Sequence, residues 1–354
     1  MSNLQFPIGI RWGKIQELDT ELMKDYGDQK MRRLNFNFLV STLTAAVIIV
    51  GTLHTQAAEK RVTVGNKNFT EQYIVGQLMK QVLEDRGFRV DLRSDLTSMA
   101  LRAGMESGDI DICADYTGTA WMVHLKRQYK PGTGHNEIYQ LVKGKDKRNH
   151  FIWLDPIWNN NAYAMASWPE FAKKHKLTTL SDLAGLYRKR EGKIETFVDF
   201  EFSVRPDGLS ALEKFYDFTI AKSTVRTGTP GASLIALKRR KTHIAMVFGT
   251  DASIAKYGWH VYSDDKSFFP PYDLTPYVGK DALDKYPEIA DILNKLVATF
   301  PGGGKPATPE ILAECQKVWQ KLNAEVDIER MEPTEVAHQY LREYGLIKDW
   351  KNLN

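Results

Sequence analysis

Three short apolar runs alternate with two helical segments between residues 61 and 114, and this order constrains the fold more than any other part of the chain. The apolar runs cover residues 61–65, 89–92 and 110–114, and each mostly alternates apolar with polar side chains, as strands do. The segments between them have apolar residues three and four positions apart, which is typical of amphipathic helices. A β-α-β-α-β order with short joints predicts a parallel sheet covered by helices.

A second αβ pattern follows, and one late strand then precedes a helical C-terminal region. Thr70 and Thr250 stand where predicted helices begin, so we expect both to be N-caps. The strands of the second unit and the late strand are predicted at residues 162–166, 196–200, 243–248 and 274–278.

The late strand indicates that the second unit is inserted into the first, because the chain can then return to its first sheet. We place lobe 1 at residues 58–162 and 270–354, and lobe 2 at residues 163–269. The predicted fold class is therefore α/β, with two lobes and two crossovers between them.

An apolar run at residues 38–53 lies between two arginines and a group of small residues that ends near Ala57. This order is that of a secretory signal sequence. The run is shorter than the ~20 residues of a stable membrane span, so we interpret it as a cleaved signal and not as a retained anchor. We assign residues 1–57 to this signal, with an over-extended N terminus if Met31 is the true start, and we expect an exported protein.

Composition and motifs argue against nucleic-acid binding and catalysis. The net charge is +4, acids and bases are mixed, and no basic tract is dense enough to indicate a nucleic-acid partner. The eight histidines show no metal-ligand spacing, and the glycines at 302–304 lack the lysine of a phosphate loop. Cys113 and Cys315 lie in a predicted strand and a predicted helix, so we expect buried free thiols. We expect a monomer without catalytic residues, metal or cofactor.

The segment at residues 115–121 (DYTGTAW) joins the third predicted strand to a predicted helix at residues 120–129. Ligands of open α/β sheets bind at this carboxyl edge of the strands. The segment offers the ring of Tyr116, two hydroxyl groups and the free N–H groups of a helix start. A buried structural tyrosine explains the same pattern, so the segment alone leaves both interpretations open.

Six segments of the chain together resemble one family of binding proteins, the substrate-binding proteins of osmoprotectant ABC transporters. Those transporters take up glycine betaine, choline, carnitine or related solutes. The resemblance runs from about Val62 to Leu346, and it implies a periplasmic-binding-protein-like type II fold, a periplasmic location, and a membrane permease with a cytoplasmic ATPase as partners. The segments are 65–72 (GNKNFTEQ), 115–120 (DYTGTA), 160–164 (NNAYA), 205–208 (RPDG), 250–251 (TD) and 269–272 (FPPY).

The resemblance also implies an aromatic cage between the lobes. A quaternary ammonium group has no strong N–H donor, and aromatic faces can hold its diffuse charge at roughly 0.5–2 kcal/mol per face. Phe248 departs from the family pattern, where we expect tyrosine, and it keeps the ring face without the hydroxyl. The cage positions fall on Tyr116, Tyr163, Phe248 and Tyr272.

Polar residues of the matching motifs are expected to hold the other end of the ligand. Arg205 suits a carboxylate, because a guanidinium group can grip two oxygens at once. The resemblance adds Lys67 and Thr119 as contacts, with Gln72 and Asn161 as secondary candidates. Choline would need no arginine partner, so Arg205 favours a carboxylated ligand; we expect glycine betaine, with choline or carnitine as alternatives.

Structural interpretations and other functions remain open beside this one. Core packing also explains Tyr163 and Phe248, which lie on apolar strands, and a surface turn explains Arg205 before a proline. A receptor of the same fold for another small zwitterion, such as ergothioneine or an amino-acid-like solute, would share the motifs. A membrane-anchored sensory domain would also share them, with the apolar N-terminal run as its anchor.

Overall fold

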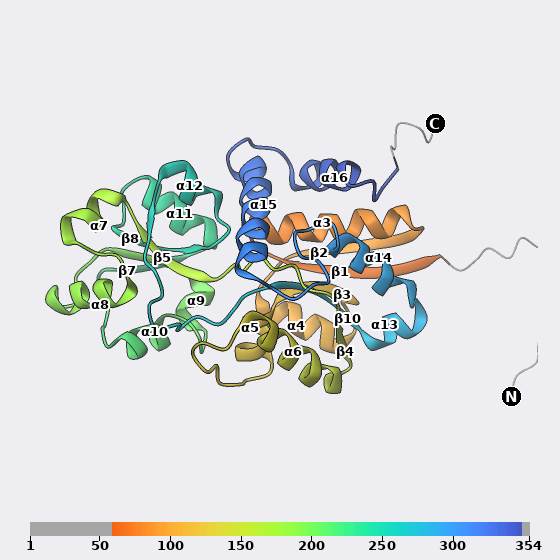
Figure 1. The fold of residues 1–354 in the computed structure, drawn as a ribbon, viewed down its shortest axis with the longest axis horizontal. Helices are drawn as coiled ribbons and strands as arrows, with labels where there is room; N and C mark the ends of the chain where they lie inside the picture. Colours follow the sequence, from red (N-terminus) through yellow and green to blue (C-terminus); the bar gives the residue numbers. More distant parts are fainter. Residues whose placement is uncertain (1–58, 349–354) are drawn as a thin grey trace, which may run out of the picture. The chain divides into compact units, whose positions relative to one another are not determined.

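The computed structural model describes residues 59–348, so the predicted signal sequence, the cleavage at Ala57 and the alternative start at Met31 lie outside the described residues. The described residues contain two five-stranded sheets, which confirms the predicted two-lobed α/β fold (Figure 1). The first sheet has the order β2-β1-β3-β10-β4, and its strands are β1 (Lys60–Lys67), β2 (Phe88–Leu96), β3 (Ile112–Tyr116), β4 (Phe151–Trp153) and β10 (Leu274–Gly279).

The second sheet repeats the arrangement of the first. In both sheets three parallel strands are followed by an antiparallel strand and then by a short edge strand. The sequence patterns do not predict β7 and β9, because both are short edge strands with little apolar alternation. The second sheet has the order β7-β6-β8-β5-β9, and its strands are β5 (Tyr163–Ser167), β6 (Thr196–Asp199), β7 (Val225–Gly228), β8 (Ile244–Phe248) and β9 (His260–Val261).

Helices cover both faces of the first sheet. Figure 1 shows α3 and α14 on one face and α4 and α6 on the opposite face. The buried side of α3 contains Ile74, Leu78 and Val82, as its apolar spacing predicts. The helical elements that belong with this sheet are α3 (Thr70–Asp85), α4 (Ser98–Ser107), α5 (Thr117–Thr119), the π-helical turn η1 (Ala120–His124), α6 (His135–Asp146), the 3-10 turn η2 (Lys147–Asn149), α13 (Lys280–Lys285), α14 (Glu288–Val297), α15 (Pro309–Asp327) and α16 (Pro333–Glu343).

Shorter helices cover the second sheet. Because β5 to β9 all belong to it and β10 returns to the first sheet, the strands follow the predicted insertion, while the exact lobe boundaries stay predictions. Within residues 59–348 no helix is long and apolar enough to cross a membrane. The helices are α7 (Pro169–His175), α8 (Leu180–Lys189), α9 (Phe200–Val204), α10 (Leu209–Tyr216), α11 (Pro230–Lys238) and α12 (Ala252–Tyr257).

Both predicted threonine N-caps are wrong, because each hydroxyl makes a long-range hydrogen bond instead. Thr70 is the first residue of α3, and its hydroxyl donates to Asp327 Oδ1 at 2.7 Å. Asp251 holds the N-cap position of α12, and the Thr250 hydroxyl donates to Glu71 Oε2 at 2.6 Å. Cys113 lies on β3 and Cys315 on α15, and both are buried free thiols, as predicted.

The helix predicted at residues 120–129 is shorter than expected. It ends with η1 at His124, and Lys126 takes a left-handed conformation with φ of 52°. The indole Nε1 of Trp121 then donates to the carbonyl of Gln128 at 2.9 Å, which holds the chain in a loop.

Two crossover segments connect the sheets, residues 154–162 and residues 262–273, and they lie side by side. The Asn161 N–H donates to the Tyr272 carbonyl at 2.8 Å, and the Tyr272 N–H donates to Asn160 Oδ1 at 3.2 Å. These bonds tie the two connections into one hinge, so Tyr272 lies on the hinge itself.

Candidate functional site

A cavity of about 300 Å³ lies between the two lobes, where strands of both sheets end. Lys67 and Tyr116 are the last residues of β1 and β3 in lobe 1, while Asp199, Gly228 and Phe248 are the last residues of β6, β7 and β8 in lobe 2. Carboxyl ends of strands are the expected ligand edge of such sheets. The cavity is therefore the candidate site.

Eight of the nine predicted site residues line this cavity. The exception is Gln72, whose side chain accepts from the Lys67 N–H and donates to the Ala114 carbonyl, both at 3.2 Å. Gln72 thus ties the β1–α3 connection to β3 from behind the cavity wall. The eight lining residues are Lys67, Tyr116, Thr119, Asn161, Tyr163, Arg205, Phe248 and Tyr272.

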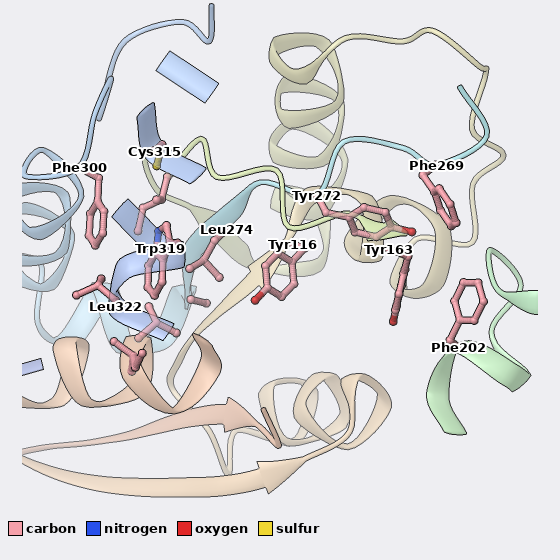
Figure 2. Close-up of a cluster of buried hydrophobic side chains, with 14 of the residues drawn as sticks. Tyr116, Tyr163, Phe202, Phe269, Tyr272, Leu274, Phe300, Cys315, Trp319 and Leu322 are labelled. Carbon is pink, nitrogen blue, oxygen red and sulfur yellow. The ribbon is translucent and has the colours of Figure 1, made fainter. Parts of the chain in front are cut away.

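Five aromatic rings form the cavity wall beside the exposed ring of Phe200, and we call them the cage rings: Phe69, Tyr116, Tyr163, Phe248 and Tyr272. The Tyr163 centroid lies 5.2 Å from that of Phe248 and 5.6 Å from that of Tyr272. The Phe69 centroid lies 5.1 Å from that of Phe248 and 6.2 Å from that of Tyr116. Figure 2 shows Tyr116, Tyr163 and Tyr272 gathered in one region. Both lobes contribute rings to a single group.

Phe69 is a cage ring that sequence reasoning missed. It holds the N-cap position of α3, and it stacks on Phe248 of the other lobe with an angle of 20° between the ring planes. The sequence feature that could have identified Phe69 is its place inside the segment 65–72, which resembles the family.

The guanidinium group of Arg205 already grips two oxygens, and they belong to the protein. Its Nε and Nη2 donate to the two carboxylate oxygens of Asp207 at 2.7 and 2.6 Å, and Nη1 donates to Glu201 Oε1 at 3.1 Å. Both Nη atoms also reach the Thr119 hydroxyl at 3.3 and 3.2 Å. Although burial opposes it, Arg205 holds the pKa of Asp207 below its ordinary value. The guanidinium donors that we expected to bind a ligand carboxylate are therefore occupied by protein carboxylates in this structure.

Each predicted cation also lies over a cage tyrosine. Lys67 forms a buried ion pair with Asp115, and its Nζ lies 5.0 Å from the Tyr116 ring centroid. The Arg205 Cζ lies 5.3 Å from the Tyr163 ring centroid. Neither cation therefore leaves an uncompensated positive charge at the cavity.

Carboxylates beside the cavity are the main residues that the sequence analysis missed. Burial raises the pKa of Asp199 to about 6, although its carboxylate accepts from the Phe202 N–H. Glu201 Oε2 accepts from the Ser98 N–H at 3.2 Å, which links the two lobes at the cavity wall. Glu71 lies behind Tyr116 and is 1% exposed. No spacing in the sequence distinguishes these acids from surface residues.

Comparisons with known proteins show which family this chain resembles in sequence and fold. Residues 60–343 match a family model described as the substrate binding domain of ABC-type glycine betaine transport systems. The glycine-betaine-binding protein of Pseudomonas aeruginosa is 31% identical over 300 residues, which cover 83% of this chain and 91% of that protein. The carnitine transport binding protein OpuCC of Listeria monocytogenes is 31% identical over 290 residues, 81% of this chain and 87% of that protein.

A solved structure is similar over the same region. The crystal structure of a glycine betaine/carnitine/choline ABC transporter protein superimposes with a TM-score of 0.60 at 27% identity. The match covers 81% of this chain and 100% of that chain. The matched relatives are substrate-binding proteins of transport systems and not enzymes.

Proposed function

The chain belongs to the family of substrate-binding domains of ABC-type glycine betaine transport systems, and we propose that it holds a quaternary ammonium solute among its cage rings. The proposed ligand is glycine betaine, with choline or carnitine as the nearest alternatives. The observation that carries the proposal is the set of five rings, contributed by both lobes, around one cavity of about 300 Å³. That volume is at the small end of the ~300–1,000 Å³ of ligand pockets, which suits a small solute.

Binding follows from the chemistry of the cage rings. Each face attracts a cation by roughly 0.5–2 kcal/mol, and the attraction is strongest where water is excluded. Several faces together offset the cost of ordering a small ligand. Rotation about the hinge closes the lobes around the solute.

The partners follow from the same proposal. A signal sequence directs the protein to the periplasm, where it acts as a monomer. The loaded form docks on a membrane permease that a cytoplasmic ATPase drives. Neither catalysis nor a nucleic-acid partner belongs to this function.

A ligand screen tests the proposal directly. We expect glycine betaine, choline or carnitine to raise the melting temperature of the mature chain, because a ligand that binds the native state stabilises it. Isothermal titration calorimetry then gives the affinities. A response to ergothioneine or an amino acid alone would contradict the quaternary ammonium assignment and favour a receptor for another zwitterion.

Replacing Arg205 by alanine is expected to lower the affinity for glycine betaine about tenfold, which is ~1.4 kcal/mol. The affinity for choline should stay within about twofold of that of the unmodified protein. Only betaine has a carboxylate, which can replace Thr119 and Glu201 on the Nη atoms of Arg205. Calorimetry with both ligands measures the difference. The double variant Arg205→Ala/Asp207→Asn is the control, because it avoids leaving Asp207 buried and unpaired. Equal losses for the two ligands would rule out the carboxylate role.

Cation affinity is expected to fall as the pH drops through about 6. The Asp199 pKa of about 6 lies above the ordinary value, so the carboxyl group is mostly neutral at pH 5 and ionised at pH 7.5. Choline keeps its charge throughout, so any change in its affinity reports on the protein. We expect several-fold weaker choline binding at pH 5, and a flatter profile in Asp199→Asn, which keeps an N-cap side chain. A steep profile that persists in Asp199→Asn would contradict this assignment.

A further inference from the structure

Glu71 is a buried carboxylate at the edge of the site without a cationic partner. It is 1% exposed and forms no ion pair with any lysine, arginine or histidine among residues 59–348. Two other buried carboxylates here differ, since Asp115 is paired with Lys67 and Asp207 with Arg205, whereas Asp199 shares with Glu71 the lack of an ion pair within residues 59–348. An unpaired buried charge is costly to the fold, so its presence needs an explanation.

Four neutral donors hold the Glu71 carboxylate in place. Oε1 accepts from the Tyr116 hydroxyl at 2.8 Å, from Asn159 Nδ2 at 2.8 Å and from Asn161 Nδ2 at 3.1 Å. Oε2 accepts from the Thr250 hydroxyl at 2.6 Å. Burial raises the pKa of Glu71, and these four bonds act against that rise. The donors fix the carboxylate but supply no full positive charge.

Tyr116 connects this carboxylate to the cavity. Its ring is one of the cage rings, and its hydroxyl donates to Glu71 on the side away from the cavity. A phenol that donates to a carboxylate gains electron density, which makes its ring face more attractive to a cation. The carboxylate charge itself also acts through a medium of low dielectric constant, where it is weakly screened.

We propose that Glu71 is the counter-charge of the bound ligand, a specificity-determining residue that selects a permanently cationic headgroup over a neutral group of the same shape without touching it. This inference rests on the proposed function. The ligand supplies the positive charge that Glu71 lacks. The Tyr116 ring transmits the attraction to the cavity.

The test compares choline with 3,3-dimethylbutan-1-ol, in which carbon replaces the quaternary nitrogen and removes the charge while keeping the shape. Both are titrated calorimetrically into the mature protein and into Glu71→Gln. We expect Glu71→Gln to lower the affinity for choline about tenfold, or ~1.4 kcal/mol, and to change the affinity for the neutral alcohol less than twofold. Equal weakening of both ligands would show a purely structural role and overturn the proposal, as would no change in either.

Two further variants separate charge from hydrogen bonding. Thr250→Val removes one bond to Glu71 but keeps the charge, so the preference for choline over the alcohol should stay as in the unmodified protein. The double variant Glu71→Gln/Asn159→Asp keeps a hydrogen bond between these two side chains and moves the negative charge from position 71 to position 159. It should therefore restore the preference for choline over the alcohol. It also serves if Glu71→Gln alone does not fold. Failure of the double variant to prefer choline would overturn the proposal, whereas unmodified protein that binds no quaternary ammonium compound would refute the proposed function itself.

Discussion

Replacing Tyr116 by alanine is expected to lower the affinity for the quaternary ammonium ligand by tenfold or more, at least ~1.4 kcal/mol. The substitution removes one cage ring that is only 4% exposed and opens a space that water can enter. It also removes one of the four donors to Glu71, which leaves that buried carboxylate less well satisfied. Direct loss of a ring face and weaker exclusion of water act in the same direction.

Calorimetry on folded variants measures this loss, with circular dichroism to verify the fold. Tyr344→Ala is the matched control, because Tyr344 is 45% exposed beyond α16 and does not line the cavity. We expect the control to bind as the unmodified protein does. Unchanged affinity in folded Tyr116→Ala would remove this residue from the cage.

Replacing Asp146 by alanine is expected to cost about 3–5 kcal/mol of unfolding free energy, because it removes the buried partner of Arg102 and leaves this arginine with Glu106, whose side chain is 58% exposed. Both Nη atoms of Arg102 donate to the Asp146 carboxylate at 2.8 Å, and Trp153 Nε1 and Asn149 Nδ2 donate to it as well. The Arg102 and Asp146 side chains are 6% and 0% exposed. The pair joins α4 to α6, with Trp153 of β4 attached.

Urea unfolding followed by tryptophan fluorescence measures the cost. The exposed pair between Arg61 and Asp91 is the control, since its side chains are 56% and 38% exposed and solvent screens its charges. Asp91→Ala should leave the urea midpoint nearly unchanged. If Asp146→Ala unfolds at the same urea concentration as Asp91→Ala, burial does not determine how much an ion pair contributes to the unfolding free energy.

Much of the fold follows from local patterns. The α4 helix lies between the apolar runs 89–92 and 110–114, where a helical segment is predicted, and it ends at Gly108, since apolar spacing and a glycine C-cap are local features. Thr70 and Thr250 were misassigned because their hydroxyl partners, Asp327 and Glu71, are distant in sequence. A preference for capping is a local tendency, and tertiary hydrogen bonds override it.

The candidate site was predictable where motifs mark it and unpredictable where burial decides the chemistry. Tyr116, Tyr163 and Tyr272 belong to segments that match the family, and the structure brings them together at one cavity. The pairing of Arg205 with Asp207, only two residues away, cannot be told from a solvent-exposed pair in the sequence. Glu71 is harder still, because its donors come from β3, a crossover segment and the loop after β8.

The place of the cage rings in the chain has a consequence for unloading. Tyr163 directly follows one crossover segment, Tyr272 lies on the other, and Tyr116 and Phe248 end strands of opposite sheets. A swing that parts the lobes pulls Tyr116 away from Phe248, whereas Tyr163 stays beside Phe248 because the two residues are paired across β5 and β8. Opening therefore divides the group of rings between the two lobes. Under the proposed function, release of the solute is thereby coupled to the same lobe movement that admits it.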